Sequence, residues 1–160
     1  MTARRSRHSG PRFTVVMPAH QAAATIEEAI GSVLAQTIAD FELLVVENTS
    51  SDGTLQRAER FASRDPRVYV FHLEQGSPVV GRNLGIEKAR GEYVTFLDSD
   101  DVYAPGFLDA VERAIGAYPG RTLYALGGVS VSPDGARSPL SPTMPRDAPK
   151  ELTLADATWM

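Results

Sequence analysis

The sequence predicts a three-layer α/β/α domain built on a mostly parallel sheet. Short apolar runs alternate with amphipathic stretches along residues 13–135, which is the pattern of buried strands followed by the helices that cover them. The chain has 160 residues and 42% of them are hydrophobic, so it is long enough to bury one sizeable core. The same length excludes two large domains.

The first half of the domain contains three of the predicted strands. They are the apolar runs at 13–18, 42–47 and 67–73. A helix is expected at 26–34, because apolar residues recur there at helical spacing and Thr25 with Glu28 has the pattern of a capping box. A second amphipathic helix is expected at 55–62, after the loop-forming segment 48–53.

The second half of the domain continues the alternation of helices and strands. Its expected elements are a helix from the loop at 74–78 to about 90, a strand at 92–98, a helix at 107–118, a strand at 122–132 and a turn at 132–135. We expect Gly91 to end the first of these helices. Pro105 suits the first turn of the second helix, where a missing amide hydrogen is tolerated.

Two flanking segments differ from the domain in composition. Residues 1–12 contain Arg4, Arg5, Arg7 and Arg12 without any acid, and we expect a disordered basic tail there. Residues 136–150 contain four of the 11 prolines, which predicts an extended linker. We expect a short helix in the last ten residues, where apolar positions recur at helical spacing.

The composition excludes several kinds of chemistry and partner. There is no cysteine, so a disulfide framework, a thiolate zinc site and a cysteine nucleophile are impossible. The net charge is −4, and the body outside the basic tail is more acidic still, which argues against nucleic acid as a partner. The apolar run at 13–17 has only five residues before Pro18, which is too short for a signal segment or a membrane span. We expect a cytoplasmic protein, with a weak contact between the tail and the inner membrane surface left open.

Polar residues follow three of the predicted strands, at 18–21, 47–53 and 98–101. In an open parallel sheet, ligands bind beyond the carboxyl ends of the strands, where the strand order reverses. The last of these segments has three carboxylates within four residues, and a divalent cation relieves such repulsion. Oxygen ligands favour Mg²⁺ or Mn²⁺. The alternative is that Asp101 caps the next helix and the other acids are solvated.

Four motifs stand in a distinctive order along the chain. They are VVMPAHQ (15–21), SVLAQT (32–37), DFELLVVENTSSDGT (40–54) and GRNLGIEKARGEYVTFLDSDD (81–101). Together they resemble the family-2 glycosyltransferases of the GT-A fold. The resemblance implies a Rossmann-like domain at 13–135 that binds a nucleotide diphosphate sugar, the donor, and the start of a truncated acceptor region at 136–160. It implies metal-dependent, inverting transfer of the sugar to an unknown glycan, lipid or other hydroxyl acceptor.

The resemblance also implies roles for the residues around the fourth strand. Asp98 and Asp100 occupy the two acidic positions of the D-x-D motif, with Ser99 between them in the donor site. Asp100 is predicted to bind Mn²⁺ or Mg²⁺ directly, and Asp98 to face the ribose or the water shell of the metal. Arg82 and Asn83 match the family's A-R-N positions. The arginine contacts phosphate or clamps the acidic loop, and the asparagine shapes the sugar pocket.

The nucleotide base is expected over the ends of the first two strands. Pro18, Ala19 and His20 form the turn there, and the ring of His20, which replaces the usual tyrosine, can stack on the base. Glu47 and Asn48 stand where the family usually shows two aspartates, the second of which accepts a hydrogen bond from the base. Asn48 can accept but also donate, so the base stays open, with a UDP-sugar as the first candidate.

No catalytic base can be assigned, because the acids that follow the last core helix lie outside any motif of the family. One alternative is therefore a nucleotide-sugar-binding fragment without turnover. Another is a phosphatase of the haloacid-dehalogenase type, since DSDDV (98–102) fits its nucleophile motif with Asp98 as the nucleophile. The sugar, the acceptor and the oligomeric state do not follow from these patterns.

Overall fold

The structure is a computed structural model that describes residues 9–74, 77–120, 128–131 and 136–140. Its elements are β1 (Phe13–Ala19), α1 (Ile26–Leu34), β2 (Phe41–Asn48), α2 (Thr54–Ala62), β3 (Val68–Leu73), α3 (Pro78–Lys88), β4 (Tyr93–Phe96), α4 (Phe107–Ala117), β5 (Gly128–Val131) and β6 (Arg137–Leu140). The chain divides after Phe107 into two compact units, which we describe separately.

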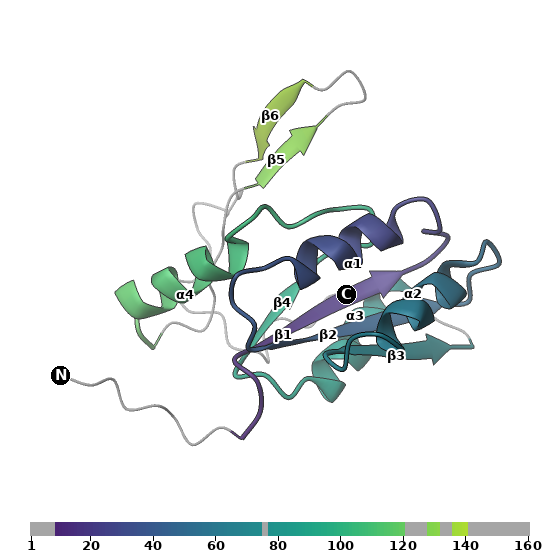
Figure 1. The fold of residues 1–160 in the computed structure, drawn as a ribbon, viewed down its shortest axis with the longest axis horizontal. Helices are drawn as coiled ribbons and strands as arrows, with labels where there is room; N and C mark the ends of the chain where they lie inside the picture. The colour runs from purple at the N-terminus through teal and green to yellow at the C-terminus, as the bar shows by residue number, and fades with distance from the viewer. Residues whose placement is uncertain (1–8, 75–76, 121–127, 132–135, 141–160) are drawn as a thin grey trace. The chain divides into compact units, whose positions relative to one another are not determined.

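The first unit is built on a parallel sheet with the strand order β3-β2-β1-β4. Figure 1 shows α1 and α2 on one face of this sheet and α3 on the other. The chain moves outward from β1 to β3 and then returns through α3 to the opposite side of β1. Right-handed crossovers require the helices to change faces when this direction reverses. The arrangement confirms the predicted three-layer class.

The two central strands contain the core of this unit. Every residue of β1 and of β2 is buried, whereas the edge strand β4 alternates between half-buried and exposed positions. Strands that are covered on both faces read as continuous apolar runs, which explains why these segments were recognisable in the sequence. The exceptions in these two strands are the buried polar residues Thr14, Glu42, Glu47 and Asn48, of which Thr14 and Glu47 are fully buried.

The predicted capping box at the start of α1 is wrong. Thr25 is the N-cap residue, but its side chain makes no capping hydrogen bond. Its hydroxyl donates back to Ala22 O at 3.4 Å instead. The amides of Thr25 and Ile26 both donate to Ala22 O, so a backbone turn precedes the helix. The Thr25 hydroxyl bonds to this turn and not to an amide of the helix.

Helix α3 lies very close to the sheet because glycines face it. A Cβ atom on Gly85 would overlap the side chain of Val16, and one on Gly81 would come within 3.5 Å of Pro18 Cβ. The helix begins at Pro78 after Ser77, whose hydroxyl accepts from the Val80 amide at 3.4 Å. Because α3 follows β3 in a parallel sheet, its start lies at the edge where the strands end.

Gly91 does not end α3, contrary to the expectation from the sequence. The helix ends at Lys88, because Ala89 has extended backbone angles of −60° and 131°. Gly91 lies where the chain passes over the start of β1, and an added Cβ atom would be 2.5 Å from Thr14 N. The glycine is therefore required for a close approach between two backbones.

The remaining elements are described by themselves. Strands β5 and β6 form an antiparallel pair, so residues 137–140 are a strand where an extended linker was expected. Most of the strand predicted at 122–132 and the turn at 132–135 lie outside the described residues, as do residues 1–8 and 141–160. At the end of the predicted tail, Arg12 forms an ion pair with Glu92 at 2.6 Å. No helix in the described part of the chain has the length and hydropathy to cross a membrane.

Candidate functional site

The candidate site lies at the edge of the sheet where the parallel strands end. The strand order reverses between β1 and β4, so the end of β1 lies between the ends of β2 and β4. Pro18 and Ala19 are its last residues, and they pair in register with Val46 and Glu47. Asp98 comes two positions after the pair Val16–Phe96, as Pro18 does on β1. The fold therefore brings together the three segments predicted to bind a ligand.

The loops that follow β1 and β2 are joined by hydrogen bonds between their side chains and backbones. These bonds run from Gln21 N to Ser50 Oγ (3.0 Å), Gln21 Nε2 to Ser51 Oγ (3.1 Å), Ala22 N to Thr54 Oγ1 (2.8 Å) and Ala23 N to Asp52 Oδ2 (2.9 Å). Gln21 has a left-handed φ of 49°, a conformation that non-glycine residues adopt only when their surroundings hold them there. The two loops thus form one preorganised unit.

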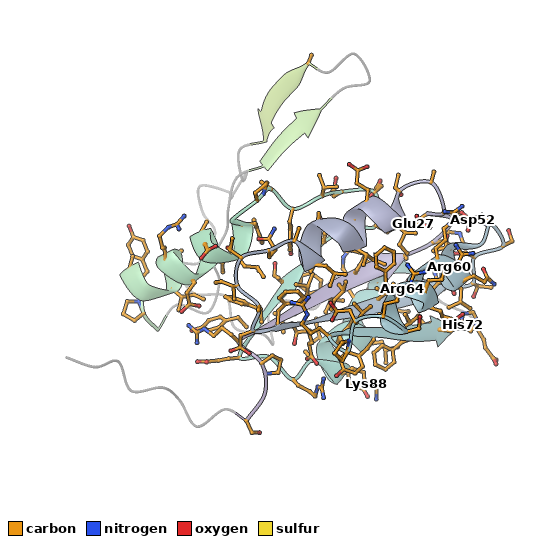
Figure 2. The ribbon with its side chains drawn as sticks, in the orientation of Figure 1. Glu27, Asp52, Arg60, Arg64, His72 and Lys88 are labelled. Carbon is orange, nitrogen blue, oxygen red and sulfur yellow. The ribbon has the colours of Figure 1, made fainter. Side chains whose placement is uncertain are left out.

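Asp52 connects this unit to the start of α2. Its Oδ1 accepts from Thr54 N at 3.0 Å and from Thr54 Oγ1 at 2.6 Å. The bond from the Thr54 hydroxyl, followed by that from the Ala23 amide, lowers the pKa of Asp52. Asp52 therefore binds the first amide of the helix. Figure 2 shows its side chain beside α2.

Asn48 presents an unusual polar atom at the end of β2. The residue is 9% exposed, and its Oδ1 is buried without a hydrogen-bond partner among the residues that the structure describes. Its backbone oxygen lies 2.6 Å from Nδ1 of the exposed His20 side chain. Buried acceptors nearly always have a donor, since an unpaired one costs about 1–3 kcal/mol. Asn48 Oδ1 is thus suited to receive an N–H group from a ligand.

Glu47 has a different role from the residue that follows it. Its side chain is fully buried, with Oε1 accepting from Ser50 N at 2.5 Å and Oε2 lying 2.6 Å from His72 Nδ1. Both oxygens of Glu47 therefore already have protein partners. No local sequence pattern singles out His72. His72 of β3 pairs in register with Glu47 of β2, and this pairing, which only the tertiary structure reveals, is the observation that identifies the residue.

The acidic segment after β4 makes an ion pair with α3. Arg82 donates to Asp98 Oδ1, and the side chain of Asp98 remains 47% exposed. Ser99 is buried, whereas Asp100 and Asn83 are exposed. Partial desolvation, followed by the charges of Asp100 and Asp98, raises the pKa of Asp101. The segment therefore has a negative potential, which Arg82 neutralises in part.

A tyrosine that the sequence analysis did not identify anchors this acidic segment. The Tyr103 hydroxyl donates to Phe96 O at 3.1 Å and lies 2.9 Å from Thr95 Oγ1. Its amide donates to Ser32 Oγ on α1 at 3.0 Å. Burial raises the pKa of Tyr103, so the hydroxyl keeps its proton and remains a donor. The residues after Asp101 are thus tied to both β4 and α1.

The exposed carboxylates of this segment fit a divalent cation. In the described ranges, no three His, Asp or Glu side chains gather as a complete metal site. Mg²⁺ characteristically takes one or two carboxylates together with substrate phosphates and water. Asp100 is exposed and Asp98 keeps one oxygen outside its ion pair, so these two residues can supply the protein share of such a site.

Known proteins share both the sequence and the fold of this chain. Residues 14–139 match the family described as glycosyl transferase family 2. A putative teichuronic acid biosynthesis glycosyltransferase of Bacillus subtilis, TuaG, is 34% identical over 150 residues, which are 92% of this chain and 57% of TuaG. The uncharacterized glycosyltransferase EpsJ of the same organism is 38% identical over 91 residues, 57% of this chain and 26% of EpsJ. The chain thus spans little more than half of these relatives at most.

Two solved structures are similar at the level of the fold. The 1–349 fragment of S. aureus TarS in complex with UDP-GlcNAc has a TM-score of 0.62 and 28% identity, over 71% of this chain and 37% of that fragment. The mannosyltransferase PcManGT from Pyrobaculum calidifontis, in complex with GDP-Man and Mn²⁺, has a TM-score of 0.63 and 27% identity, over 70% of this chain and 34% of that protein. Because the family match extends over residues 14–139, this chain belongs to glycosyltransferase family 2.

Proposed function

We propose that the sheet edge formed by β1, β2 and β4 binds a nucleotide diphosphate sugar as the donor of a glycosyl transfer. The observation that supports this proposal most directly is the buried Oδ1 of Asn48, which has no hydrogen-bond partner among the described residues. The similar structures contain UDP-GlcNAc in TarS and GDP-Man with Mn²⁺ in PcManGT, which supports a ligand of the same class here. Family membership leaves the phosphatase alternative without support.

The residues of the site have complementary tasks in this proposal. The base lies against His20 and donates an N–H group to Asn48 Oδ1. The diphosphate lies towards Arg82, whose guanidinium can bind phosphate oxygens in two-point contacts. Asp100 and Asp98 hold the cation. When bound, Mn²⁺ or Mg²⁺ supplies a positive charge that stabilises the nucleoside diphosphate as it departs.

The transfer itself is proposed as a single displacement with inversion. The acceptor oxygen forms a bond to the anomeric carbon, the bond from that carbon to the diphosphate oxygen breaks, and the acceptor proton passes to a base. We assign no residue as this base. Since the chain spans at most 57% of the relatives reported above, donor binding without turnover is the second candidate function. Assays for donor hydrolysis and for transfer to glycan and lipid acceptors separate the two.

We expect Asp100→Asn to weaken the metal-dependent binding of UDP. The substitution keeps the shape of the side chain and removes one carboxylate, so the Kd for UDP in the presence of Mn²⁺ should rise about tenfold. Calorimetric titration with and without Mn²⁺ measures this effect. Glu59→Gln is the matched control, because it neutralises an exposed carboxylate on α2, away from the site. Equal losses of UDP affinity in both variants, or UDP binding that does not depend on Mn²⁺, would contradict the assignment of Asp100 to the metal.

We expect Asn48→Leu to weaken nucleotide binding without destabilising the fold. Leucine has a similar shape but offers no acceptor, so the Kd for UDP should rise about tenfold. The free energy of unfolding should stay the same or increase, because the substitution removes a buried oxygen that has no partner within the described ranges. Titrations of UDP, GDP, CDP and TDP against the wild type identify the base. A loss of stability with unchanged affinity would show that Asn48 is structural.

A further inference from the structure

The backbone around Asn48 is held from the strands on both sides of β2. On the side of β1, His20 Nδ1 lies 2.6 Å from Asn48 O. On the side of β3, Thr49 Oγ1 donates to Leu73 O at 2.7 Å. Thr49 has a left-handed φ of 50°, which is costly for a β-branched residue. These contacts hold the chain in a conformation that it would not keep in isolation.

A further contact on the side of β3 involves the buried carboxylate of Glu47. Its Oε1 accepts from the Ser50 amide at 2.5 Å and so closes the turn after β2. Its Oε2 lies 2.6 Å from Nδ1 of His72, the residue paired with it in register on β3. A carboxylate without any exposed surface is stable only when its oxygens have donors. Glu47 thus links His72 to the backbone before and after Asn48.

We propose that His72 is a positioning residue for nucleotide recognition, which acts through Glu47 on the orientation of Asn48. This inference rests on the proposed function. His72 donates to Glu47, Glu47 holds the Ser50 amide, and the closed turn keeps Asn48 Oδ1 ready for the N–H group of the base. An acceptor that is fixed before the ligand arrives binds it more tightly, because no ordering is needed on binding.

Because of its location, His72 can be replaced without disturbing the core, so its effect on nucleotide binding can be measured separately. Its side chain is 44% exposed on the edge strand β3. Figure 2 shows His72 and Asp52 at the same end of the sheet. The residue buries little apolar surface, so its removal leaves no large cavity in the core. Its contribution lies in the hydrogen bond from Nδ1 to Glu47.

The test compares His72→Ala with His72→Asn in the full chain. The amide nitrogen of asparagine can occupy the position of Nδ1 and restore the bond to Glu47 without an imidazole ring. Glu74→Ala is the matched control, because Glu74 is exposed and lies two residues further along the chain. The measurements are the hydrogen-exchange rate of the Ser50 amide, the Kd for UDP with Mn²⁺, and an unfolding curve that establishes that each variant is folded.

We expect His72→Ala to accelerate exchange of the Ser50 amide about tenfold and to raise the Kd for UDP about tenfold. His72→Asn should return both quantities close to the wild-type values, and Glu74→Ala should change neither. A purely structural role would lower the unfolding midpoint without this rescue of affinity by asparagine.

Three outcomes would overturn the proposal. Unchanged Ser50 exchange in His72→Ala would show that His72 does not act through Glu47. Faster exchange with unchanged affinity would show that the turn does not position the base contact. Equal losses in the alanine and asparagine variants would assign the effect to the imidazole ring itself. If the wild type binds no nucleotide, the proposed function fails, and Ser50 exchange still decides whether His72 controls the turn.

Discussion

Replacing Gly91 with alanine is expected to destabilise the protein by about 3 kcal/mol, the upper end of the usual cost of overpacking. The new Cβ atom would lie 2.5 Å from Thr14 N and 2.7 Å from both Phe13 C and Thr14 Oγ1. Two of these atoms belong to the backbone of β1, which is buried throughout and cannot move aside. The shift would also stretch the bond from Gly91 N to Thr14 Oγ1, now 2.8 Å. Urea denaturation monitored by circular dichroism measures the change.

Gly31→Ala is the matched control and should have the opposite sign. Gly31 is in α1, and a Cβ atom added there would meet nothing within 4 Å. Alanine is the better helix former, so the substitution should stabilise the protein by about 0.5–1 kcal/mol. If Gly91→Ala proved as harmless as Gly31→Ala, the close approach of residue 91 to β1 would be disproved.

Arg90→Ala is expected to cost about 3 kcal/mol, because it leaves a buried carboxylate without its countercharge. Glu42 is 2% exposed and accepts from Arg90 Nε at 2.8 Å and Arg90 Nη2 at 2.5 Å. After the substitution, the Thr14 hydroxyl and the amide of residue 90 would still donate to it, but neither carries a charge. The guanidinium also covers the ring of Tyr69, with 4.8 Å between the guanidinium carbon and the ring centroid, and that contact would be lost too. Equilibrium unfolding in urea measures the loss.

Two further variants test this explanation. Arg60→Ala removes an exposed guanidinium on α2 that has no ion-pair partner in the described part of the chain, and it should change stability by less than about 0.5 kcal/mol. Adding Glu42→Gln to Arg90→Ala should recover part of the lost stability, because a neutral amide is less costly to bury than an unpaired charge. No recovery in the double variant would argue that packing, and not charge, explains the effect of Arg90.

Local patterns in the sequence were sufficient for the elements of the first unit. Its four strands and its helices all appear within a few residues of the predicted positions. The hydrophobic period is a local property, and the cover on both faces of β1 and β2 makes their apolar runs continuous. The ends of elements were less predictable. Helix α3 ends before Gly91, because Ala89 already has an extended backbone. The Thr25 hydroxyl donates to Ala22 O and does not cap α1 as expected.

The candidate site was predictable in its location and only partly in its contacts. The motifs placed Asn48 and the segment from Asp98 to Asp100 at strand ends, and the fold brings these ends to one edge. The contacts that support the site could not be predicted from the sequence in the same way. His72 meets Glu47 across 25 residues, and Tyr103 reaches Ser32 across 71 residues. Such pairs depend on strand register and on the face that each helix covers.

The sequence by itself determined the three-layer class, the order of the elements and the family, because these depend on periodicity and on motifs that lie close together along the chain. Only the tertiary structure decided which polar side chains at the strand ends are available to a ligand. Glu47 and Asn48 are neighbours in sequence, yet one is saturated by partners from β3 and the turn, and the other keeps a buried oxygen without a partner in the described residues. The physical reason is that successive side chains of a strand point to opposite faces, and each face meets different neighbours.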